Sequence, residues 1–186
     1  KKSFENWCGF SDTRHLSVLL ENYLCIHNFY IPAGGDIPDV KLNKKFNHKI
    51  KFLNEMKSYF KKNIPTKSIL VGDLNIAPYE NDVWSHNQLI NVVSHTPQET
   101  KSLLELKNVS NWIDVGRKFI SKEEKLYTWW SYRNRDWKKS NRGRRLDHIW
   151  ITQDLDNKLK SFENFKKIRD WKKPSDHVPI VVELNI

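Results

Sequence analysis

Three short acidic phrases in this chain could supply hydrolytic chemistry, and each adjoins an apolar run that predicts a β-strand. The phrases are Gly72-Asp73-Leu74-Asn75, Arg145-Leu146-Asp147-His148 and Ser175-Asp176-His177-Val178-Pro179. Carboxylate and amide oxygens suit Mg²⁺ or Mn²⁺, and an imidazole can supply a proton or hydrogen-bond a phosphate. These groups at strand ends predict metal-assisted hydrolysis of a phosphate ester.

Each phrase also has a simpler interpretation. The first could form only a turn, Asp147 could serve as a partner for Arg145, and Asp176-His177 could be a helix cap or a surface pair. Each signal is weak by itself. Their joint occurrence at successive strand ends favours the catalytic interpretation.

The rest of the chain is basic and rich in tryptophan. It has 32 Lys and Arg against 22 Asp and Glu in 186 residues, a formal net charge of +10, and eight Trp. This balance points to a polyanionic partner, although charge alone fits a merely soluble surface about equally well. Tryptophan beside Arg and Lys can stack on bases or wedge into a duplex, and some of these rings will be core.

Composition and length limit the class of protein. The chain is 38% hydrophobic and 29% charged, which favours a globular domain over a disordered chain. No apolar run approaches membrane-spanning length, so we expect no membrane partner. Cys8 and Cys25 lack metal-ligand spacing and suit a reducing compartment, which favours a cytoplasmic protein.

Strands and helices are expected to intermix without a repeat or a linker. Strands are predicted over 16–20, 23–30, 69–71, 126–132, 149–151 and 180–182, helices over 43–62, 86–93 and 97–109, and a Lys-rich helical or loop stretch over 154–167. Thr96 ahead of Pro97 predicts an N-cap. In the first helix the apolar residues recur every three or four positions, with Lys49 among the lysines on other faces. The class is α/β (α+β), in one domain over 1–186.

The order of several longer motifs along the chain is informative. They are Asn28-Phe29-Tyr30-Ile31-Pro32, Gly72-Asp73-Leu74-Asn75-Ile76-Ala77-Pro78, Tyr127-Thr128-Trp129-Trp130-Ser131-Tyr132-Arg133, Asn141-Arg142-Gly143-Arg144-Arg145-Leu146-Asp147 and Lys173-Pro174-Ser175-Asp176-His177. Together they resemble the exonuclease III family of abasic-site endonucleases, within the endonuclease/exonuclease/phosphatase superfamily. The chain looks like the later portion of a bacterial member. The resemblance implies a four-layer sandwich of two mostly antiparallel sheets flanked by helices, with its N-terminal part, including a metal-binding Glu, absent here.

The same resemblance implies roles for individual residues. Asp73 would orient or deprotonate the attacking water, Asn75 would hold the phosphate, and Tyr30 would contact the phosphate or the leaving oxygen. Asp147 would fix the tautomer of His177, which would contact the scissile phosphate. The implied metal site, for Mg²⁺ with Mn²⁺ as an alternative, consists of Asp73, Asn75, Asp176 and His177.

DNA contacts are implied for an aromatic and basic segment. Trp129 and Trp130 would form a wall against a base-less sugar, with core packing as the alternative for each ring. Four arginines would contact DNA, with a solvated loop as the alternative: Arg133, Arg142, Arg144 and Arg145. Family members often carry an apolar residue where Arg144 stands.

The expected protein is therefore a monomeric DNA-repair nuclease acting on double-stranded DNA. It would cut 5′ to abasic sites and remove nucleotides from 3′ ends as a 3′→5′ exodeoxyribonuclease. Two alternatives are a phosphoesterase of the same superfamily and a non-catalytic DNA-binding module.

Overall fold

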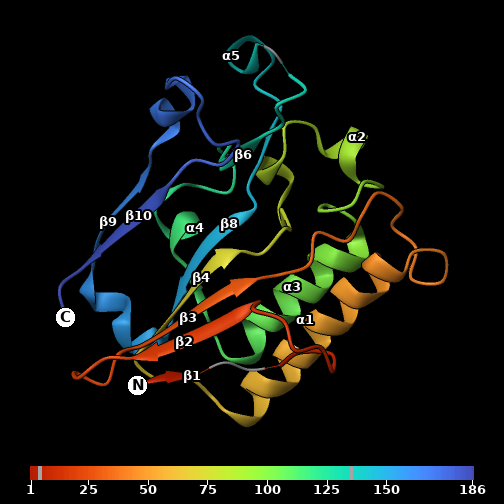
Figure 1. The fold of residues 1–186 in the computed structure, drawn as a ribbon. Coiled ribbons are helices and arrows are strands. Elements are labelled where there is room, and N and C mark those ends of the chain that lie inside the picture. Colours follow the sequence, from red (N-terminus) through yellow and green to blue (C-terminus); the bar gives the residue numbers. More distant parts are fainter. Residues whose placement is uncertain (4–5, 135) are drawn as a thin grey trace.

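The computed structural model describes residues 1–3, 6–134 and 136–186 (Figure 1). In chain order the elements are β1 (Lys2–Ser3), β2 (His15–Leu19), β3 (Cys25–Tyr30), α1 (Lys44–Lys62), β4 (Ser68–Asp73), the 3₁₀ turn η1 (Glu80–Asp82), α2 (His86–Leu89), α3 (Pro97–Val109), β5 (Ile113–Asp114), α4 (Val115–Phe119), β6 (Trp129–Trp130), α5 (Trp137–Ser140), β7 (Gly143–Arg144), β8 (Asp147–Ile151), η2 (Gln153–Lys158), β9 (Leu159–Asn164), η3 (Lys166–Asp170) and β10 (Ile180–Leu184).

A six-stranded sheet forms the centre of the molecule, in the order β1-β2-β3-β4-β8-β5. β3 and β4 are parallel, and the other neighbouring strands are antiparallel. The register pairs Tyr30 with Asp73 and Asp73 with Asp147. Three polar residues therefore meet at one end of the sheet.

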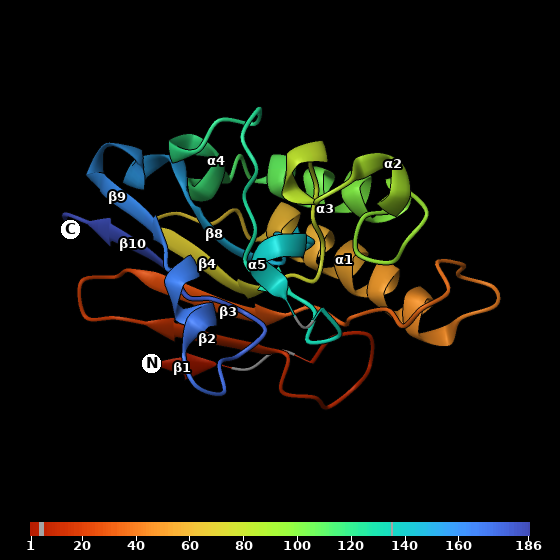
Figure 2. The ribbon, with the colours of Figure 1, turned by 90° about the horizontal axis from the view of Figure 1, so that it is seen from above.

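Helices α1 and α3 lie side by side on one face of this sheet (Figures 1 and 2). The side chain of Asn43 caps α1 by accepting from the backbone N–H groups of Lys45 and Phe46. Thr96 caps α3 in a reciprocal capping box with Glu99. The helices predicted over 43–62 and 97–109 are confirmed to within one residue, because both periodicity and caps were visible.

Alternation along the central strands builds two cores. Leu70 of β4 and Trp150 of β8 pack toward α1 and α3, while Ile69 and Ile149 pack toward the hairpin of β9 and β10. α4 lies against β8 and β9. The layered α/β architecture with helices flanking sheets is confirmed. Besides the central sheet, the described residues form two two-stranded sheets, β9 with β10 and β6 with β7.

Three predicted segments differ from the structure. Of 126–132 only Trp129–Trp130 is strand, and of 86–93 only His86–Leu89 is helix. The stretch 154–167, expected as helix or loop, contains strand β9. Its lysines hide the strand signal, and pairing with β10 is what orders it. None of the described helices has the length and apolar character needed to cross a membrane.

Candidate active site

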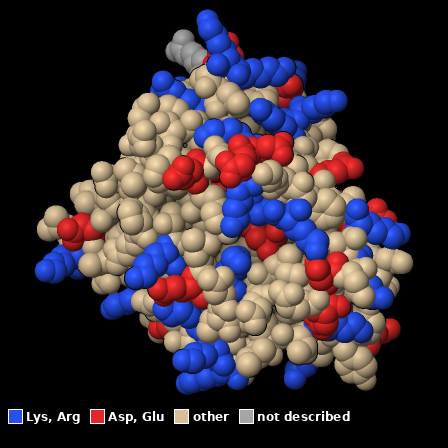
Figure 3. Space-filling view, turned by 180° about the vertical axis from the view of Figure 1, so that it is seen from behind, with Lys and Arg blue, Asp and Glu red and all other residues tan. Residues whose placement is uncertain are grey.

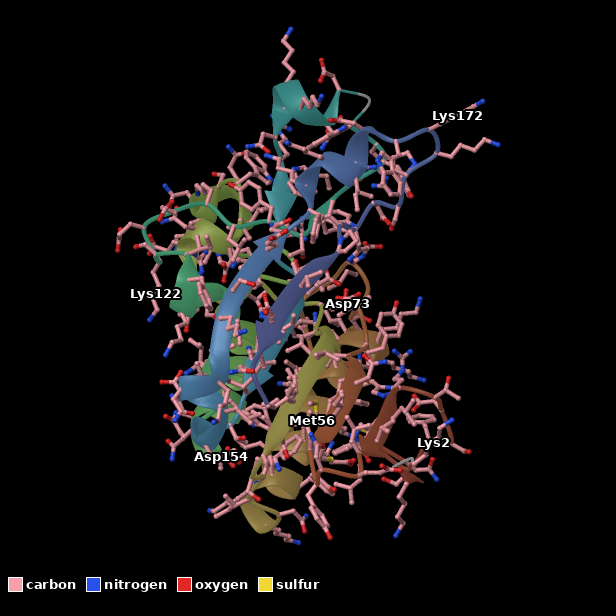
Figure 4. The ribbon with its side chains drawn as sticks, turned by 90° about the vertical axis from the view of Figure 1, so that its left-hand side faces the viewer. Lys2, Met56, Asp73, Lys122, Asp154 and Lys172 are labelled. Carbon is pink, nitrogen blue, oxygen red and sulfur yellow. The ribbon has the colours of Figure 1, made fainter. Side chains whose placement is uncertain are left out.

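The strand register brings the three acidic phrases together. Asp73 ends β4 directly opposite Asp147, which begins β8. Figure 4 labels Asp73 at this end of β4. His177 arrives from the segment before β10 and forms an isolated bridge with Trp129. Side chains from four separate parts of the chain, including Tyr30 at the end of β3, therefore share one site.

The first phrase spans the end of β4 and the segment that follows it. Gly72 has a φ of +139°, and a Cβ on it would lie 1.9 Å from the backbone oxygen of Phe29, so a side chain cannot fit there. Asn75 is left-handed, with a φ of +53°. Its backbone N–H donates to Oδ1 of Asp73 at 2.9 Å, and its Nδ2 donates to Oδ2 of Asp73 at 3.0 Å. Asn75 therefore fixes both oxygens of the Asp73 carboxylate.

The second and third phrases form a histidine–carboxylate pair. Nδ1 of His177 lies 2.8 Å from Oδ2 of Asp147. Because the carboxylate accepts, Nδ1 carries the proton and Nε2 is left for another partner. Burial alone would lower the pKa of His177. The hydrogen bond and charge of Asp147, with the charges of Asp73 and Asp176, outweigh burial and raise that pKa.

The electrostatics of the site shift the pKa of the Asp73 carboxyl group. Burial, and then the nearby charge of Asp147, raise the pKa of Asp73 from 3.8 to about 6, against smaller opposing effects of the Asn75 N–H group, His177 and Lys49. A carboxylate with a pKa in this range is mostly ionised at neutral pH and accepts a proton more readily than an ordinary one. In this arrangement the Asp73 carboxylate is able to accept a proton from a bound water molecule.

Asp73, Asn75 and His177 line a cavity of about 730 Å³ that also has an aromatic and cationic wall. The residues of the floor and the wall include Tyr30, Asp73, Asn75, Trp84, Trp129, Arg133, Arg142, Arg144 and His177. The guanidinium of Arg142 lies 4.6 Å from the ring centre of Trp84, and that of Arg144 lies 5.6 Å from Trp129. An acidic floor beside arginine–tryptophan stacks suits a phosphate ester joined to an organic group.

Comparison with known proteins places the chain in a family. A model described as the Endonuclease/Exonuclease/phosphatase family matches residues 56–177. The chain belongs to this family. It is 28% identical over 168 residues to exodeoxyribonuclease III of Haemophilus influenzae, a match that covers 86% of this chain and 61% of that protein. The chain thus spans about three-fifths of the length of this relative.

Solved structures agree with the assignment. An AP endonuclease from Archaeoglobus fulgidus is 27% identical with a TM-score of 0.84, over 94% of this chain and 66% of that one. A 3′ phosphatase from Neisseria, solved with a product DNA hairpin, has a TM-score of 0.87 over 100% of this chain and 70% of its own, and at 21% identity it shows the fold. The predicted resemblance to the exonuclease III family is confirmed.

In this family member the two neighbouring tryptophans have different surroundings. Trp129 lines the cavity and donates from Nε1 to Oδ2 of Asp176 at 2.9 Å. Trp130 is 1% exposed and packs in a core cluster with Tyr127 and Val178. A fully buried ring cannot contact a sugar, so the DNA-binding role predicted for Trp130 is wrong and core packing is its role.

The four arginines also differ in their surroundings. Arg133, Arg142 and Arg144 line the cavity. Arg145 is 2% exposed and pairs with two buried carboxylates, at 2.8 Å from Asp114 and 2.8 Å from Asp82. The phosphate contact predicted for Arg145 is wrong, because a guanidinium held between two buried carboxylates is not available to DNA.

Charge on the surface does not locate a DNA interface by itself. On the face shown in Figure 3, Lys and Arg are interspersed with groups of Asp and Glu. A larger cavity, of about 940 Å³, is lined by residues such as Trp137, Phe165 and Lys166, and shares no described residue with the cavity that contains Asp73. Of these two cavities, the one that contains Asp73 is also lined by Asn75 and by the imidazole of His177, the groups suited to phosphate ester hydrolysis.

A divalent cation fits the site only in part. Among the described residues, no three His, Cys, Asp or Glu side chains are grouped to hold a metal. Asp176 is engaged by Trp129, and both amide hydrogens of Asn75 are used, by Ile31 and Asp73. Mg²⁺, however, commonly takes one or two carboxylates and completes its shell with water and substrate phosphate. Asp73 suits that role, and the amide oxygen of Asn75 has the right chemistry beside it.

Sequence reasoning missed a buried pair behind the site. Lys49, expected on a face of α1 away from the apolar side, is 0% exposed and pairs with Glu99, also 0% exposed, at 2.5 Å. A lysine in an amphipathic helix usually reaches water, so the burial of Lys49 was not predicted. Its offset of three residues from both Phe46 and Phe52 was the available hint.

Proposed function

We propose that this family member is a DNA-repair nuclease that hydrolyses phosphodiester bonds in duplex DNA. It would cut 5′ to abasic sites and act from 3′ ends as a 3′→5′ exodeoxyribonuclease. The observation that supports this most is the single cavity that joins Asp73, Asn75 and His177 to a wall of Trp129 and arginines. The Haemophilus relative and the Neisseria structure with DNA support the choice of substrate.

The chemistry follows from the geometry of the floor. Asp73, with its raised pKa and its two oxygens fixed by Asn75, would accept a proton from the attacking water. His177, charged more readily because of Asp147, would hydrogen-bond a phosphate oxygen through Nε2. Tyr30, at the rim of the same cavity, would donate to the phosphate or the leaving oxygen. These groups stabilise charge where it develops in the transition state.

The proposed cofactor is Mg²⁺, with Mn²⁺ as an alternative. Asp73 would hold it, together with the oxygen of Asn75. When bound, a divalent cation neutralises charge on the phosphate and makes water more acidic.

Recognition would be divided between the tryptophan and the arginines of the cavity wall. Trp129 would contact the sugar at a base-less position, where an intact nucleoside leaves no room. Arg133, Arg142 and Arg144 would contact backbone phosphates of double-stranded DNA. We propose a monomer that acts in the bacterial cytoplasm.

Cleavage of a duplex with one synthetic abasic site tests the proposal. We expect nicking 5′ to that site in the presence of Mg²⁺ and its loss with EDTA. Release of phosphate from a small ester without competition by duplex DNA would favour a phosphoesterase acting on another substrate. Salt-sensitive DNA binding by folded protein without cleavage would favour the non-catalytic DNA-binding alternative.

A further inference from the structure

Lys49 connects three segments beneath the catalytic cavity. Its Nζ donates to the backbone oxygen of Asn75 at 2.8 Å, to that of Ala33 at 3.2 Å and to Oε1 of Glu99 at 2.5 Å. An ammonium has three protons, so these contacts use its full capacity. Ala33 follows β3 and Asn75 follows β4. One side chain from α1 therefore ties together the loops that carry the floor of the cavity.

Glu99 extends the same network toward the rim. Its carboxylate accepts from the backbone N–H of Ser94 at 3.0 Å and from the N–H and hydroxyl of Thr96. Ser94 has a φ of +85°, and its hydroxyl accepts from Nη1 of Arg144 at 2.7 Å. Arg144 also donates to the backbone oxygen of Val93 at 3.0 Å. The chain of bonds runs from the floor, through the buried pair, to an arginine of the wall.

We infer that Lys49 is a positioning residue, which with Glu99 sets the distance between the Asn75–Asp73 floor and the Arg144 wall of the cavity. The inference rests on the proposed hydrolysis for its role, and on the network for its geometry. Asn75 is left-handed and its side chain fixes Asp73, so a shift of the Asn75 backbone displaces the base directly. Displacements of about 1 Å in such a site can cost about 100-fold in rate.

Stability alone does not account for this pair. Removing two charges from water carries a desolvation cost, and neutral replacements of similar volume are often as stable or more stable. A second pair joins the same two helices, Lys57 of α1 to Glu105 of α3 at 2.8 Å, and both of its side chains reach solvent. The surface pair could link the helices just as the buried pair does. What the buried pair adds is its contact with Ala33, Asn75 and Ser94.

The test replaces both charges at once. Lys49→Met with Glu99→Gln removes the ammonium without leaving an unpaired buried charge, and we expect a folded protein. Its kcat for abasic-site cleavage should fall about 100-fold with KM for DNA nearly unchanged. The side-chain amide signals of Asn75 in NMR spectra should shift. The matched control, Lys57→Met with Glu105→Gln, should change neither.

The outcomes of this experiment distinguish failure of the positioning role from failure of the proposed function. A folded double variant with wild-type kcat and wild-type Asn75 signals would overturn the inference. Shifted Asn75 signals with no cleavage by the unaltered protein would keep the positioning role and reject the proposed function. If the double variant does not fold, hydrogen-bond couplings from Nζ of Lys49 to the carbonyl of Asn75 in the unaltered protein decide. Their observation supports the inference and their absence overturns it.

Discussion

At the residue scale, the raised pKa that would favour proton transfer to Asp73 also lowers the stability of the fold at neutral pH. The pKa of Asp73 in the folded chain is about 6 against 3.8 ordinarily, chiefly because of burial. The folded state thus holds the proton more tightly than the unfolded state. Stability contributed by the protonated group is present below pH 3.8 and is lost as pH rises through 6. At neutral pH the ionised Asp73 destabilises the fold.

Asp73→Asn should therefore abolish cleavage, leave DNA binding nearly unchanged and stabilise the protein at pH 7.5. We expect a gain of about 1–2 kcal/mol, after allowing for one lost hydrogen bond to Asn75. Near pH 4 the gain should vanish. Urea unfolding at the two pH values measures this, alongside nicking and binding assays. Equal stability differences at both pH values would contradict the role of ionisation, and retained turnover would contradict the role of Asp73 as base.

The neighbouring tryptophans give a second contrast between single residues. Trp129→Ala should weaken discrimination of abasic from intact duplex more than it weakens overall affinity, because the ring lines the cavity. Trp130→Ala should instead cost about 3–5 kcal/mol in unfolding free energy, because the ring is buried. Paired binding assays and denaturation curves distinguish them. Equal loss on both DNAs for Trp129→Ala would assign that ring to the core as well.

At the element scale, the short strand β7 and its flanks divide their arginines by position. Arg142 is exposed and stacks on Trp84, whereas Arg145 is buried between Asp82 and Asp114. Between them Gly143 lies against Tyr127, whose ring atoms would be 2.6 Å from an added Cβ. Two arginines three residues apart thus lie on the surface and in the core.

Two matched substitutions follow from that division. Arg145→Met should cost about 3–5 kcal/mol in stability, because it leaves Asp114 buried without its cationic partner, while Asp82 keeps its ion pair with Arg117. Arg142→Met should leave stability within about 0.5 kcal/mol, while weakening DNA binding and lowering its salt dependence by about one charge. Thermal unfolding and binding titrations at several salt concentrations provide the comparison. A severe loss of stability in Arg142→Met would reverse the assignment.

Helices and strands were predicted correctly where local sequence signals agreed, and wrongly where tertiary contacts determine the structure. Asn43 and Thr96 marked the starts of α1 and α3 in sequence and in structure. The positions of Asp73, Asp147 and His177 in one site followed from strand ends and from family resemblance. Burial of Arg145 and Lys49 could not be read, because a charged residue looks the same in sequence whether it meets water or a buried partner.

At the scale of the whole molecule, three of the buried histidines contribute strongly to the response to acid. Burial, as the main cause, lowers the pKa values of His15, His27 and His148 to about 4. In the unfolded chain each would titrate near 6.5. Their neutral forms contribute stability that is complete above pH 6.5 and is lost as pH falls toward 4. Asp73 acts in the opposite sense and offsets about one of the three protons that these histidines take up on acid unfolding.

We therefore expect the free energy of unfolding to fall steeply between pH 6.5 and 5, by up to about 3 kcal/mol per pH unit. His148→Gln should lower the slope of this profile by about one proton, because glutamine does not titrate. Its amide can still donate to the backbone oxygen of Ile76, so we expect the variant to fold. Urea midpoints measured from pH 5 to 7.5 test both statements. A profile that is flat in the parent protein, or equally steep in the variant, would contradict them.

The close approach of Gly72 to the backbone of β3 affects how mutational maps of this protein would be interpreted. Any side chain at position 72 collides with the backbone of β3, so the junction between β3 and β4 must open before it can be accommodated. Position 72 would then tolerate no replacement in a selection for activity, although it has no side chain to offer a substrate. In such a map it would look like a catalytic residue, while its neighbour Leu74, fully buried, would accept other apolar side chains. The intolerance of position 72 to substitution would reflect the short distance between the backbones of β3 and β4.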